Sequence, residues 1–410
     1  MKRKNIIVFL IIMFAGNLLN AHPLDFYIST ALKNSPLLKD YNNQLLSAGF
    51  DSLLVKAAYK PQVSQNTQVM YPITGKNFGY DENITNGGNY SALVSVIQPL
   101  LNKKFIKGQI ESVSLSSQAV KVNARISEID LKKSVTGQYL TAYTNYSQLQ
   151  STKSVLKLLQ DEQSVLKQMI DKGVYLVTDY MNLNVSIKAQ EITIKQSFIQ
   201  YKNNLNLLNF LCGIADTTTV ALENPGITLN NSFNANNSPL MEQFKIDSLK
   251  NINSKYLVDL NYLPKLHAFA DGGFNAILPK NIPNNFGSSF GLNLTMVILD
   301  GKQRKLQYNK ISLTENTRAY YRNYYTTQYK QQFLQLEEQL KLTNELISTY
   351  KSQLADQEKL IGLYKIEIEK GLVRFIDFVT IVTNYTTTKT NFSMAEINRL
   401  QIINQMNYLK

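Results

Sequence analysis

The sequence repeats itself once, and this repeat is what most constrains the fold. Two motifs recur 203 positions later (238 − 35, 262 − 59): Ser35-Pro36 as Ser238-Pro239, and Tyr59-Lys60-Pro61 as Tyr262-Leu263-Pro264. Two others recur 198 positions later (299 − 101, 371 − 173): Leu101-Asn102 as Leu299-Asp300, and Lys172-Gly173 as Lys370-Gly371. A period of roughly 200 residues is too long for a solenoid repeat. The repeat therefore predicts two pseudo-equivalent halves, one of which has a loop five residues shorter (203 − 198).

The N-terminus has the features of a secretion signal. Lys2, Arg3 and Lys4 precede an apolar run over residues 6–14, and Ala21 is a small residue suited to cleavage. The apolar run is much shorter than the roughly 20 residues of a transmembrane helix, and no later stretch reaches that length. We predict a signal peptide and an exported mature chain; a retained membrane anchor is the alternative.

Composition argues against several classes of function. Cys212 is the single cysteine, so no internal disulfide can form, and its place at the end of a helical pattern predicts a small buried hydrophobic side chain. The net charge of +13 is spread along the chain, which favours solvated helix faces over a nucleic-acid surface. The two histidines, His22 and His267, lie far apart in the sequence, and no phosphate-binding loop is present. We predict no metal site, no cofactor, no nucleic-acid partner and no enzymatic activity.

Long helices are predicted in two parts of the chain. Prolines are missing between Pro99 and Pro225 and after Pro283, so helices can continue there without a break. Over residues 105–172 apolar side chains recur at three- and four-residue steps on two faces, as in a long helix with a neighbour on each side. Such a helix is about 100 Å long. The predicted helices are 24–58, 105–172 and 178–211 in the first half, and 240–260, 305–370 and 376–409 in the second.

Before each long helix the periodicity changes from that of a helix to that of a strand. Side chains alternate over residues 63–71 and 90–97, and again over 290–296. We predict a β-hairpin in each half, over about 62–99 and 265–298, with loops rich in Gly and Asn. Ten residues is about the length that a tilted strand needs to cross a membrane. Half-buried strands of a soluble sheet have the same alternation.

These features predict the order of domains along the chain. The signal peptide covers residues 1–21, and the first repeat 22–214 has its helical tip at about 172–179. A linker over 215–237, rich in Thr and Asn, leads to the second repeat 238–410, which has its tip at about 370–377. Gly173 and Gly371 suit the left-handed position at the end of a helix.

Four strands per chain cannot close a barrel. Open strand edges are not tolerated in lipid, because each unpaired backbone group costs several kcal/mol there. The smallest outer-membrane barrels have about eight strands. If the strands cross a membrane, several copies must share one wall, and three copies would contribute twelve strands.

The duplicated frame resembles that of the TolC-type outer-membrane efflux proteins. The resemblance covers nearly the whole mature chain, and its motifs are the two Tyr-x-Pro segments, Leu299-Asp300-Gly301 and the two tips. It implies a mainly α-helical protein with membrane β-structure, which forms a homotrimer with a twelve-strand β-barrel and a twelve-helix α-barrel. It also implies a location in the outer membrane of a Gram-negative bacterium, in contact with its lipid, and extending into the periplasm.

The same resemblance implies a passive channel of a tripartite efflux or type I secretion system. Its partners would be a periplasmic adaptor (membrane fusion) protein at the helix tips and, through it, an inner-membrane transporter. The expected adaptor contacts are Gly173, Val174, Gly371 and Leu372. Drugs, metal ions, peptides and proteins all remain possible substrates.

The resemblance also implies gate residues at the tips. Asp377 matches an aspartate that faces the closing aperture in related channels, whereas Thr380 occupies the position of a second gate carboxylate. Asp179 matches an aspartate that latches the closed tip, but Ile368 occupies the place of its tyrosine partner, so the latch is missing or passes through Arg374. Helix N-capping would explain either aspartate equally well.

Basic residues recur just past the strands in both halves. Lys103, Lys104, Lys302 and Arg304 could anchor the barrel at the headgroup surface, and ordinary solvation is the alternative. Two other functions compete with the channel: a structural coiled-coil protein of the cell envelope without transport activity, and a soluble helical protein that binds nucleic acid. The hairpins argue against the first and the secretion signal against the second.

Overall fold

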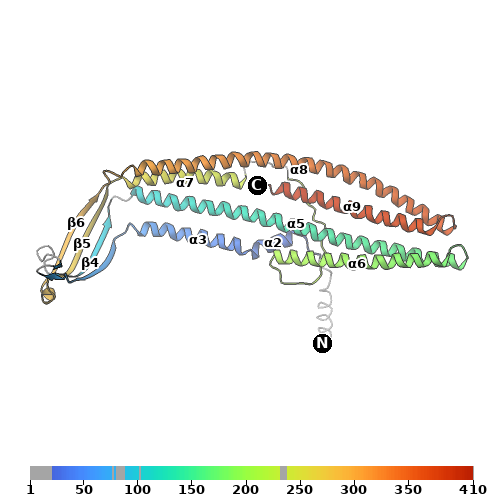
Figure 1. Cartoon of the computed structure of the whole chain (residues 1–410), viewed down its shortest axis with the longest axis horizontal. Helices are drawn as coiled ribbons and strands as arrows, with labels where there is room; N and C mark the ends of the chain where they lie inside the picture. The colour runs from blue at the N-terminus through green and yellow to red at the C-terminus, as the bar shows by residue number, and fades with distance from the viewer. Residues whose placement is uncertain (1–20, 76–77, 80–87, 101–102, 231–237, 410) are drawn as a thin grey trace, which may run out of the picture. The chain divides into compact units, whose positions relative to one another are not determined.

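The computed structural model describes residues 21–75, 78–79, 88–100, 103–230 and 238–409 (Figure 1). Residues 1–20 of the predicted signal peptide and the Leu101-Asn102 motif lie outside the described residues. The chain is mainly helical with a small antiparallel sheet, as predicted. It divides into two compact units. Of the described residues, the tip unit takes those within 1–39, 125–238 and 325–410, and the sheet unit those within 40–124 and 239–324.

Five of the six predicted helices form close to their expected positions. They are α5 (Lys103–Asp171), α6 (Val177–Leu211), α7 (Pro239–Asn261), α8 (Gln303–Glu369) and α9 (Phe375–Asn407). Within the tip unit, α6 runs back beside α5 and α9 runs back beside α8 (Figure 1). The long helices α5, α6, α8 and α9 contain no proline, which explains why they continue without interruption.

The prediction of one helix over residues 24–58 is wrong. The segment forms two helices, α2 (Leu24–Asn34) and α3 (Pro36–Ala57), which are interrupted at Ser35. Ser35 has an extended ψ of 115°, because the ring of Pro36 disfavours the helical conformation of the preceding residue. The Ser35 hydroxyl then accepts a hydrogen bond from the Leu38 N–H at 3.3 Å.

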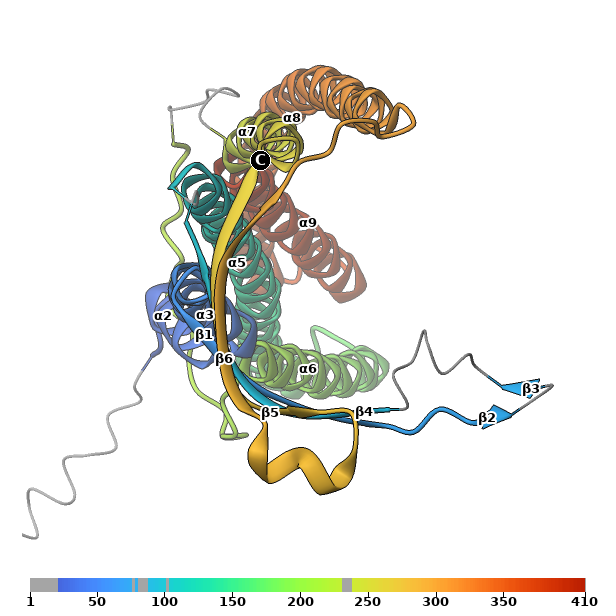
Figure 2. The same ribbon diagram turned by 90° about the vertical axis from the view of Figure 1, so that its left-hand side faces the viewer.

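Four strands form one antiparallel sheet in the order β1-β4-β5-β6. Their bounds are β1 (Gln62–Met70), β4 (Asn89–Pro99), β5 (Lys265–Ala276) and β6 (Phe286–Thr295). Figure 2 shows β4, β5 and β6 curving along one another. The hairpin loops contain a short pair of strands, β2 (Thr74–Gly75) with β3 (Phe78–Gly79), and a 3₁₀ helix, η2 (Pro279–Asn284).

The two hairpins pair in the same register. Gln62 lies opposite Ile97 in the first hairpin, and Lys265 lies opposite Thr295 in the second. Lys265 follows Gln62 by 203 positions (265 − 62) and Thr295 follows Ile97 by 198 (295 − 97). These are the two offsets of the sequence motifs, so the change of offset falls in the loop that joins the strands.

The sheet has one apolar and one polar face. Because alternate side chains point to opposite faces and direct partners share a face, the strand register assigns each residue. The apolar face carries Val63, Val69, Val94, Val96, Leu266, Phe274, Phe286, Phe290, Leu292 and Leu294, with Gln65, Thr67, Gln98 and Ser288 as polar exceptions. The polar face carries Gln62, Ser64, Asn66, Gln68, Ser91, Ser95, Lys265, His267, Asp271 and Asn293, with Leu93, Ile97 and Phe269 as apolar exceptions. The apolar side chains of the two outer strands are exposed, and Phe290 reaches 89%.

Within the sheet unit, helix α7 packs against α5 and α8. Toward α5, the Asn253 side-chain amide donates to the Gly108 carbonyl at 3.2 Å. Toward α8, Ser248 and Asn251 donate to the carboxylate of Glu315 at 3.0 and 2.8 Å. Hydrogen bonds from Arg318, Asn251 and Ser248, with that from Arg318 the strongest, lower the pKa of Glu315 to about 2.

One part of the tip-unit core lies where α2, α5 and α6 meet the linker. Tyr27, Tyr139 and Tyr201 are buried there, and the Tyr139 hydroxyl donates to the carbonyls of His22 and Glu223 at 3.0 and 2.8 Å. Burial also raises the pKa of Cys212 to about 11. The prediction that this cysteine is a buried hydrophobic side chain is confirmed.

Candidate functional site at the helix tips

Each pair of long helices ends in a tip with the same backbone structure. Gly173 and Gly371 have φ values of 74° and 69°, in the left-handed region that glycine adopts without strain. The next residue in each tip donates its N–H back by five positions, Val174 to Met169 at 2.9 Å and Leu372 to Glu367 at 3.0 Å. These bonds define a Schellman motif, which satisfies the carbonyls at the end of a helix.

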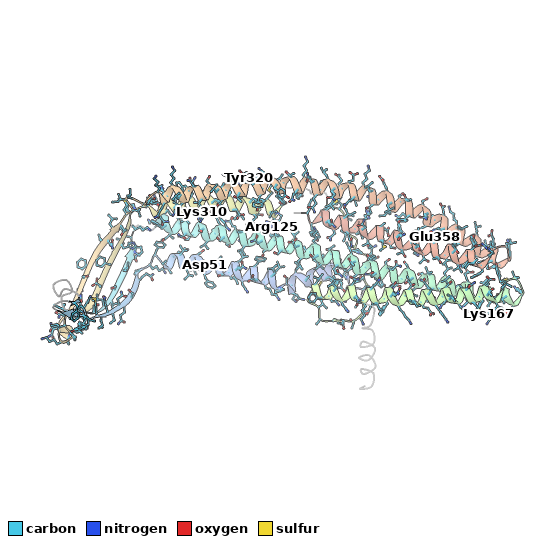
Figure 3. All side chains as sticks on the ribbon, in the orientation of Figure 1. Asp51, Arg125, Lys167, Lys310, Tyr320 and Glu358 are labelled. Atoms are coloured by element: carbon cyan, nitrogen blue, oxygen red, sulfur yellow. The ribbon has the colours of Figure 1, made fainter. Side chains whose placement is uncertain are left out.

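A buried apolar cluster, here called the tip cluster, stabilises this end of the molecule. Its buried members come from α5, α6, α8 and α9: Val155, Leu159, Leu166, Leu183, Ile187, Ile361, Ile368, Phe375, Phe378 and Val382. Ile368, which occupies the place of the expected latch tyrosine, is fully buried in the cluster. It therefore contributes packing and offers no hydrogen bond to Asp179. Nearby, Glu358 of α8 (Figure 3) accepts a hydrogen bond from Tyr385 of α9 at 2.9 Å.

The two tips are in direct contact. A Cβ atom at Gly371 would lie 2.5 Å from Val174 Cγ1, so the valine side chain occupies the space that the glycine leaves open. The Tyr175 hydroxyl donates to the Val373 carbonyl at 2.8 Å. Its ring lies edge-on to Phe375, with ring centroids 6.3 Å apart. Burial, and to a smaller extent the charge of Asp179, raises the pKa of Tyr175, so its hydroxyl remains a donor at neutral pH.

Asp179 acts on the backbone of its own helix. Its carboxylate accepts the N–H of Leu176, the residue that precedes α6, at 3.1 Å. This N–H has no partner within a helix, so the bond satisfies one of the donors at the helix start. The arrangement matches the N-terminal capping alternative considered for this residue.

Asp377 is engaged differently. Arg374 donates two hydrogen bonds to its carboxylate, from Nε at 3.0 Å and from Nη2 at 2.9 Å. This forked geometry is the strongest form of an arginine–carboxylate contact. The hydrogen bonds and the charge of Asp377 raise the pKa of the Arg374 guanidinium. Arg374 thus pairs with Asp377 of the same tip, and not with Asp179.

The remaining tip residues have simpler surroundings. Thr380 donates its hydroxyl to the Ile376 carbonyl at 2.9 Å, one turn earlier in α9. Val174 and Leu372, two of the predicted adaptor contacts, are exposed apolar side chains at the outermost turn. Whether Thr380, Val174 and Leu372 serve as gate or adaptor contacts stays a prediction.

A second group of predicted residues lies where the sheet unit changes from strand to helix. Asp300 accepts the N–H groups of Lys302 at 2.9 Å and of Arg304 at 2.8 Å, and the Tyr262 hydroxyl donates to it at 2.7 Å. These hydrogen bonds lower the pKa of Asp300. Two motifs that the repeat singles out separately, Tyr262-Leu263-Pro264 and Leu299-Asp300-Gly301, thus meet in space.

The four predicted headgroup cations differ in their contacts. Arg304 forms an ion pair with Asp259 of α7, and its guanidinium lies 5.2 Å from the centre of the Tyr262 ring. Lys302 is exposed and has a left-handed φ of 70°. Lys103 and Lys104 are exposed at the start of α5. A role in membrane anchoring stays a prediction for all four, and Arg304 additionally joins α8 to α7.

Several contacts of the site were not predicted from the sequence. They are Arg374–Asp377, Tyr175–Val373, Tyr262–Asp300 and Arg304–Asp259. The first could have been found, because residues three apart at a helix start are neighbours. The others join distant segments and depend on how the helices pack.

Within the residues that the structure covers, no cluster of three or more His, Cys, Asp or Glu is arranged to hold a metal ion. In the same part of the chain, no helix combines the length and the apolar character that a transmembrane helix requires.

Comparison with known proteins identifies the fold. No protein-family model matches the chain, and no curated protein matches it in sequence. Solved structures do match. The outer-membrane channel OprN has a TM-score of 0.73 at 12% identity, over 94% of this chain and 89% of that one. The Campylobacter jejuni CmeC outer membrane channel has a TM-score of 0.73 at 11% identity, over 94% and 85%.

The Vibrio cholerae outer membrane protein VceC has a TM-score of 0.71 at 12% identity, over 94% of each chain. At such low identity the likeness concerns the fold. The chain has the fold of these outer-membrane channels, which confirms the mainly helical fold with a small antiparallel sheet that the TolC-type resemblance implies.

Proposed function

We propose that the chain is an outer-membrane channel of a Gram-negative bacterium, and that three copies close one twelve-strand barrel. The observation that carries this proposal is the four-stranded sheet. Its apolar face is exposed along both outer strands, with Val63 and Val69 on β1 and Phe290 and Leu292 on β6. A soluble sheet would turn this face toward a core, whereas lipid would cover it in a membrane.

The sheet edges support closure by further copies. β1 and β6 are the outer strands of the sheet, so their outward backbone groups need partners in lipid. A barrel removes these edges. The polar face, with Gln68, His267 and Asn293, would then line a water-filled lumen.

The transport role rests on the long helix pairs and their tips. The helices would form a helical barrel in the periplasm, and the exposed tip residues Val174 and Leu372 would contact a periplasmic adaptor protein. An inner-membrane transporter would supply the substrate and the energy, as part of an efflux or type I secretion system. The channel itself is passive and performs no chemistry.

Purification from the outer-membrane fraction tests the proposal. Unheated protein should migrate in a denaturing gel at about three chain masses and heated protein at one, as a closed barrel resists detergent until it is heated. The same preparation should give discrete conductance steps in a planar lipid bilayer. Monomers without conductance would contradict the channel and favour the structural coiled-coil alternative.

A further inference from the structure

A single carboxylate lies on the polar face of the sheet. Asp271 of β5 is the only acidic residue in β1, β4, β5 and β6. Its carboxylate accepts a hydrogen bond from the Ser289 hydroxyl of β6 at 2.8 Å, and Ser95 of β4 lies opposite it on the other side. The ion pairs found in the described part of the chain do not include Asp271. Its negative charge is therefore available to a ligand.

The one lysine of the four strands is engaged elsewhere. Lys265 is six positions from Asp271 along β5 (271 − 265), and a strand covers about 20 Å over that length. The Lys265 ammonium group lies 5.7 Å from the centre of the Phe105 ring of α5. A positively charged ligand at Asp271 would thus not compete with this lysine for the carboxylate.

Apolar side chains surround the carboxylate. Alternate residues of a strand share a face, and diagonal neighbours on adjacent strands lie about 7–8 Å apart. By the strand register, Phe269 adjoins Asp271 along β5, and Leu93 and Ile97 are its diagonal neighbours on β4. All three belong to a face that is otherwise mostly polar. The carboxylate therefore lies within an apolar part of this face.

The Phe269 ring lies over a glycine. Gly291 of β6 is the direct partner of Phe269, and a Cβ atom at Gly291 would lie 2.7 Å from Phe269 Cζ and 2.8 Å from Cε1. The ring thus fills the space that the missing side chain leaves, as aromatic residues do beside strand glycines. The first hairpin has a different pair, Asn66 and Leu93 (269 − 203, 291 − 198). The aromatic ring beside Asp271 is therefore specific to the second hairpin.

On the other side of Asp271 the polar face has a pair of glycines. Gly273 and Gly287 are direct partners in the next row. At Gly273 a Cβ atom would collide with the Ala92 carbonyl oxygen, so the backbone requires glycine there. At Gly287 no described heavy atom lies within 4 Å of a Cβ position, so the space over this residue is open. The two residues leave a bare stretch of backbone next to the carboxylate.

We propose that Asp271, Phe269 and this glycine pair form a binding site for a planar aromatic cation, here called the Asp271 site. The carboxylate pairs with the positive charge, and the Phe269 ring attracts the same charge through its π face. The glycine pair leaves room for a flat ring. This inference rests on the proposed channel, in which the polar face lines the lumen, and it names amphiphilic organic cations as a class of substrate.

The same surroundings argue against a metal ion as the ligand. Hard divalent cations take about six or more oxygen ligands, or keep part of their water shell. The polar side chains next to Asp271 in the sheet are the hydroxyls of Ser95 and Ser289. The apolar neighbours would displace water without replacing it as a ligand. An organic cation instead buries its own apolar surface against them.

Binding of two probes with the same ring system tests the ligand class. The protein, purified in detergent from the outer-membrane fraction, is titrated with proflavine, an acridine cation, and with acridine carboxylate, an anion, by probe fluorescence. The cation should bind and the anion should not. Asp271→Asn should raise the dissociation constant of proflavine by about tenfold or more, because the charged partner is lost. Equal binding of both probes, or an unchanged constant in Asp271→Asn, would overturn the site.

The role of the ring is tested at Phe269. Phe269→Leu keeps an apolar side chain but removes the π face, and should weaken proflavine binding by about threefold. Gly287→Val fills the open space beside the carboxylate with a side chain that favours strands. It should leave the thermal stability of the protein unchanged or raise it, while proflavine binding is lost. Unchanged binding in both variants would overturn the proposed position of the ligand.

A relocated carboxylate controls for attraction by negative charge in general. Gln68 of β1 is the counterpart of Asp271 (271 − 203) and belongs to the polar face. Among its described neighbours on that face of the sheet, none is aromatic. The double variant Asp271→Gln, Gln68→Asp keeps the net charge and should lose proflavine binding as Asp271→Asn does. Retained affinity would show that any carboxylate on this face suffices, and would overturn the Asp271 site.

Conductance separates this inference from the proposed function. Proflavine should reduce the current through the wild-type protein in a planar bilayer, and should reduce it less in Asp271→Asn. Channels that conduct but neither bind proflavine nor respond to it would overturn the site and leave the proposed channel intact. Monomers without conductance would overturn the channel, and with it the place of the site in a lumen.

Discussion

The two helix tips have the same backbone but differ in how their acidic residues are used. Gly173 and Gly371 adopt the same left-handed conformation and close the same Schellman bonds. Asp179 of the first tip caps the backbone of its helix, whereas Asp377 of the second pairs with the side chain of Arg374. The residue that corresponds to Arg374 in the first tip is Leu176 (374 − 198). One change of side chain thus separates a capping role from an ion pair.

The tips also differ in how deeply the first residue of the returning helix is buried. Phe375 of the second tip is 1% exposed, and its counterpart Val177 (375 − 198) is 64% exposed. At this position the second tip thus has a buried aromatic ring and the first tip an exposed side chain, although both halves contribute equally to the buried members of the tip cluster. This asymmetry predicts unequal effects of equivalent substitutions.

The largest effect is expected from truncation of Phe375. Phe375→Ala leaves a cavity in the tip cluster and should lower the free energy of local unfolding by about 3–5 kcal/mol. Val177→Ala should change it little, because the side chain is exposed. Amide hydrogen exchange of residues 166–183 and 361–382 measures this free energy. Similar values for the two variants would contradict the asymmetry of the tips.

The next effect is expected at the two glycines. Alanine in the left-handed conformation costs about 1–2 kcal/mol, so Gly173→Ala and Gly371→Ala should both destabilise their tips. Gly371→Ala should cost more, because its Cβ would meet Val174 Cγ1, whereas no atom lies within 4 Å of a Cβ at Gly173.

The double variant Gly371→Ala, Val174→Ala controls for this clash. In this variant the loss of local unfolding free energy caused by alanine at position 371 should be close to the loss caused by alanine at position 173. Amide hydrogen exchange measures both losses. An equal cost of the two single substitutions would show that the tips do not touch at Val174.

The hydrogen bond between the tips should have a smaller effect. Tyr175→Phe removes the donor to the Val373 carbonyl and should cost about 0.5–1.5 kcal/mol. Because the pKa of Tyr175 is raised in the folded state, this contribution is fully present below about pH 10, the usual tyrosine value. It is lost as the pH rises through the higher folded-state pKa.

Thermal unfolding of the wild-type protein and of Tyr175→Phe, followed by circular dichroism from pH 7 to pH 11, measures this contribution as the difference in stability between the two proteins. The other buried tyrosines are common to both and cancel. A difference that disappears already at pH 8 would contradict a buried hydroxyl donor.

The tips illustrate which features could be predicted from the sequence. The helices and the turn glycines followed from proline-free apolar periodicity and from the repeat, since both are local patterns. The break at Ser35 was missed, although Pro36 restricts its predecessor, because the apolar pattern continues across it. The contacts of Tyr175 with Val373 and of Tyr262 with Asp300 join segments far apart in sequence. No local pattern encodes them, since they depend on how the helices pack.

Asp377 shows, at a single residue, that sequence patterns do not predict side-chain pairing. The family resemblance indicated a gate carboxylate, and the structure adds the Arg374 pair. Both residues were candidates, but their pairing depends on the conformation at the start of α9. A ring of three carboxylates that each have an arginine partner would carry little net charge at the mouth of the proposed channel.

We expect the smallest effect on stability from Arg374→Leu. The same substitution should give the most informative effect on function. This substitution gives the second tip the leucine of the first, and Asp377 should then resemble Asp179 and accept the N–H of residue 374. The pair is at the surface, so the fold should change little. In the proposed trimer three carboxylates would lose their counter-ions, so block of the conductance by a trivalent cation should increase several-fold.

Asp377→Asn in the same background should abolish the increase, as no carboxylate remains to bind the cation. If Arg374→Leu leaves the block unchanged, Asp377 does not face the ion pathway, and the difference between the two tips is structural alone.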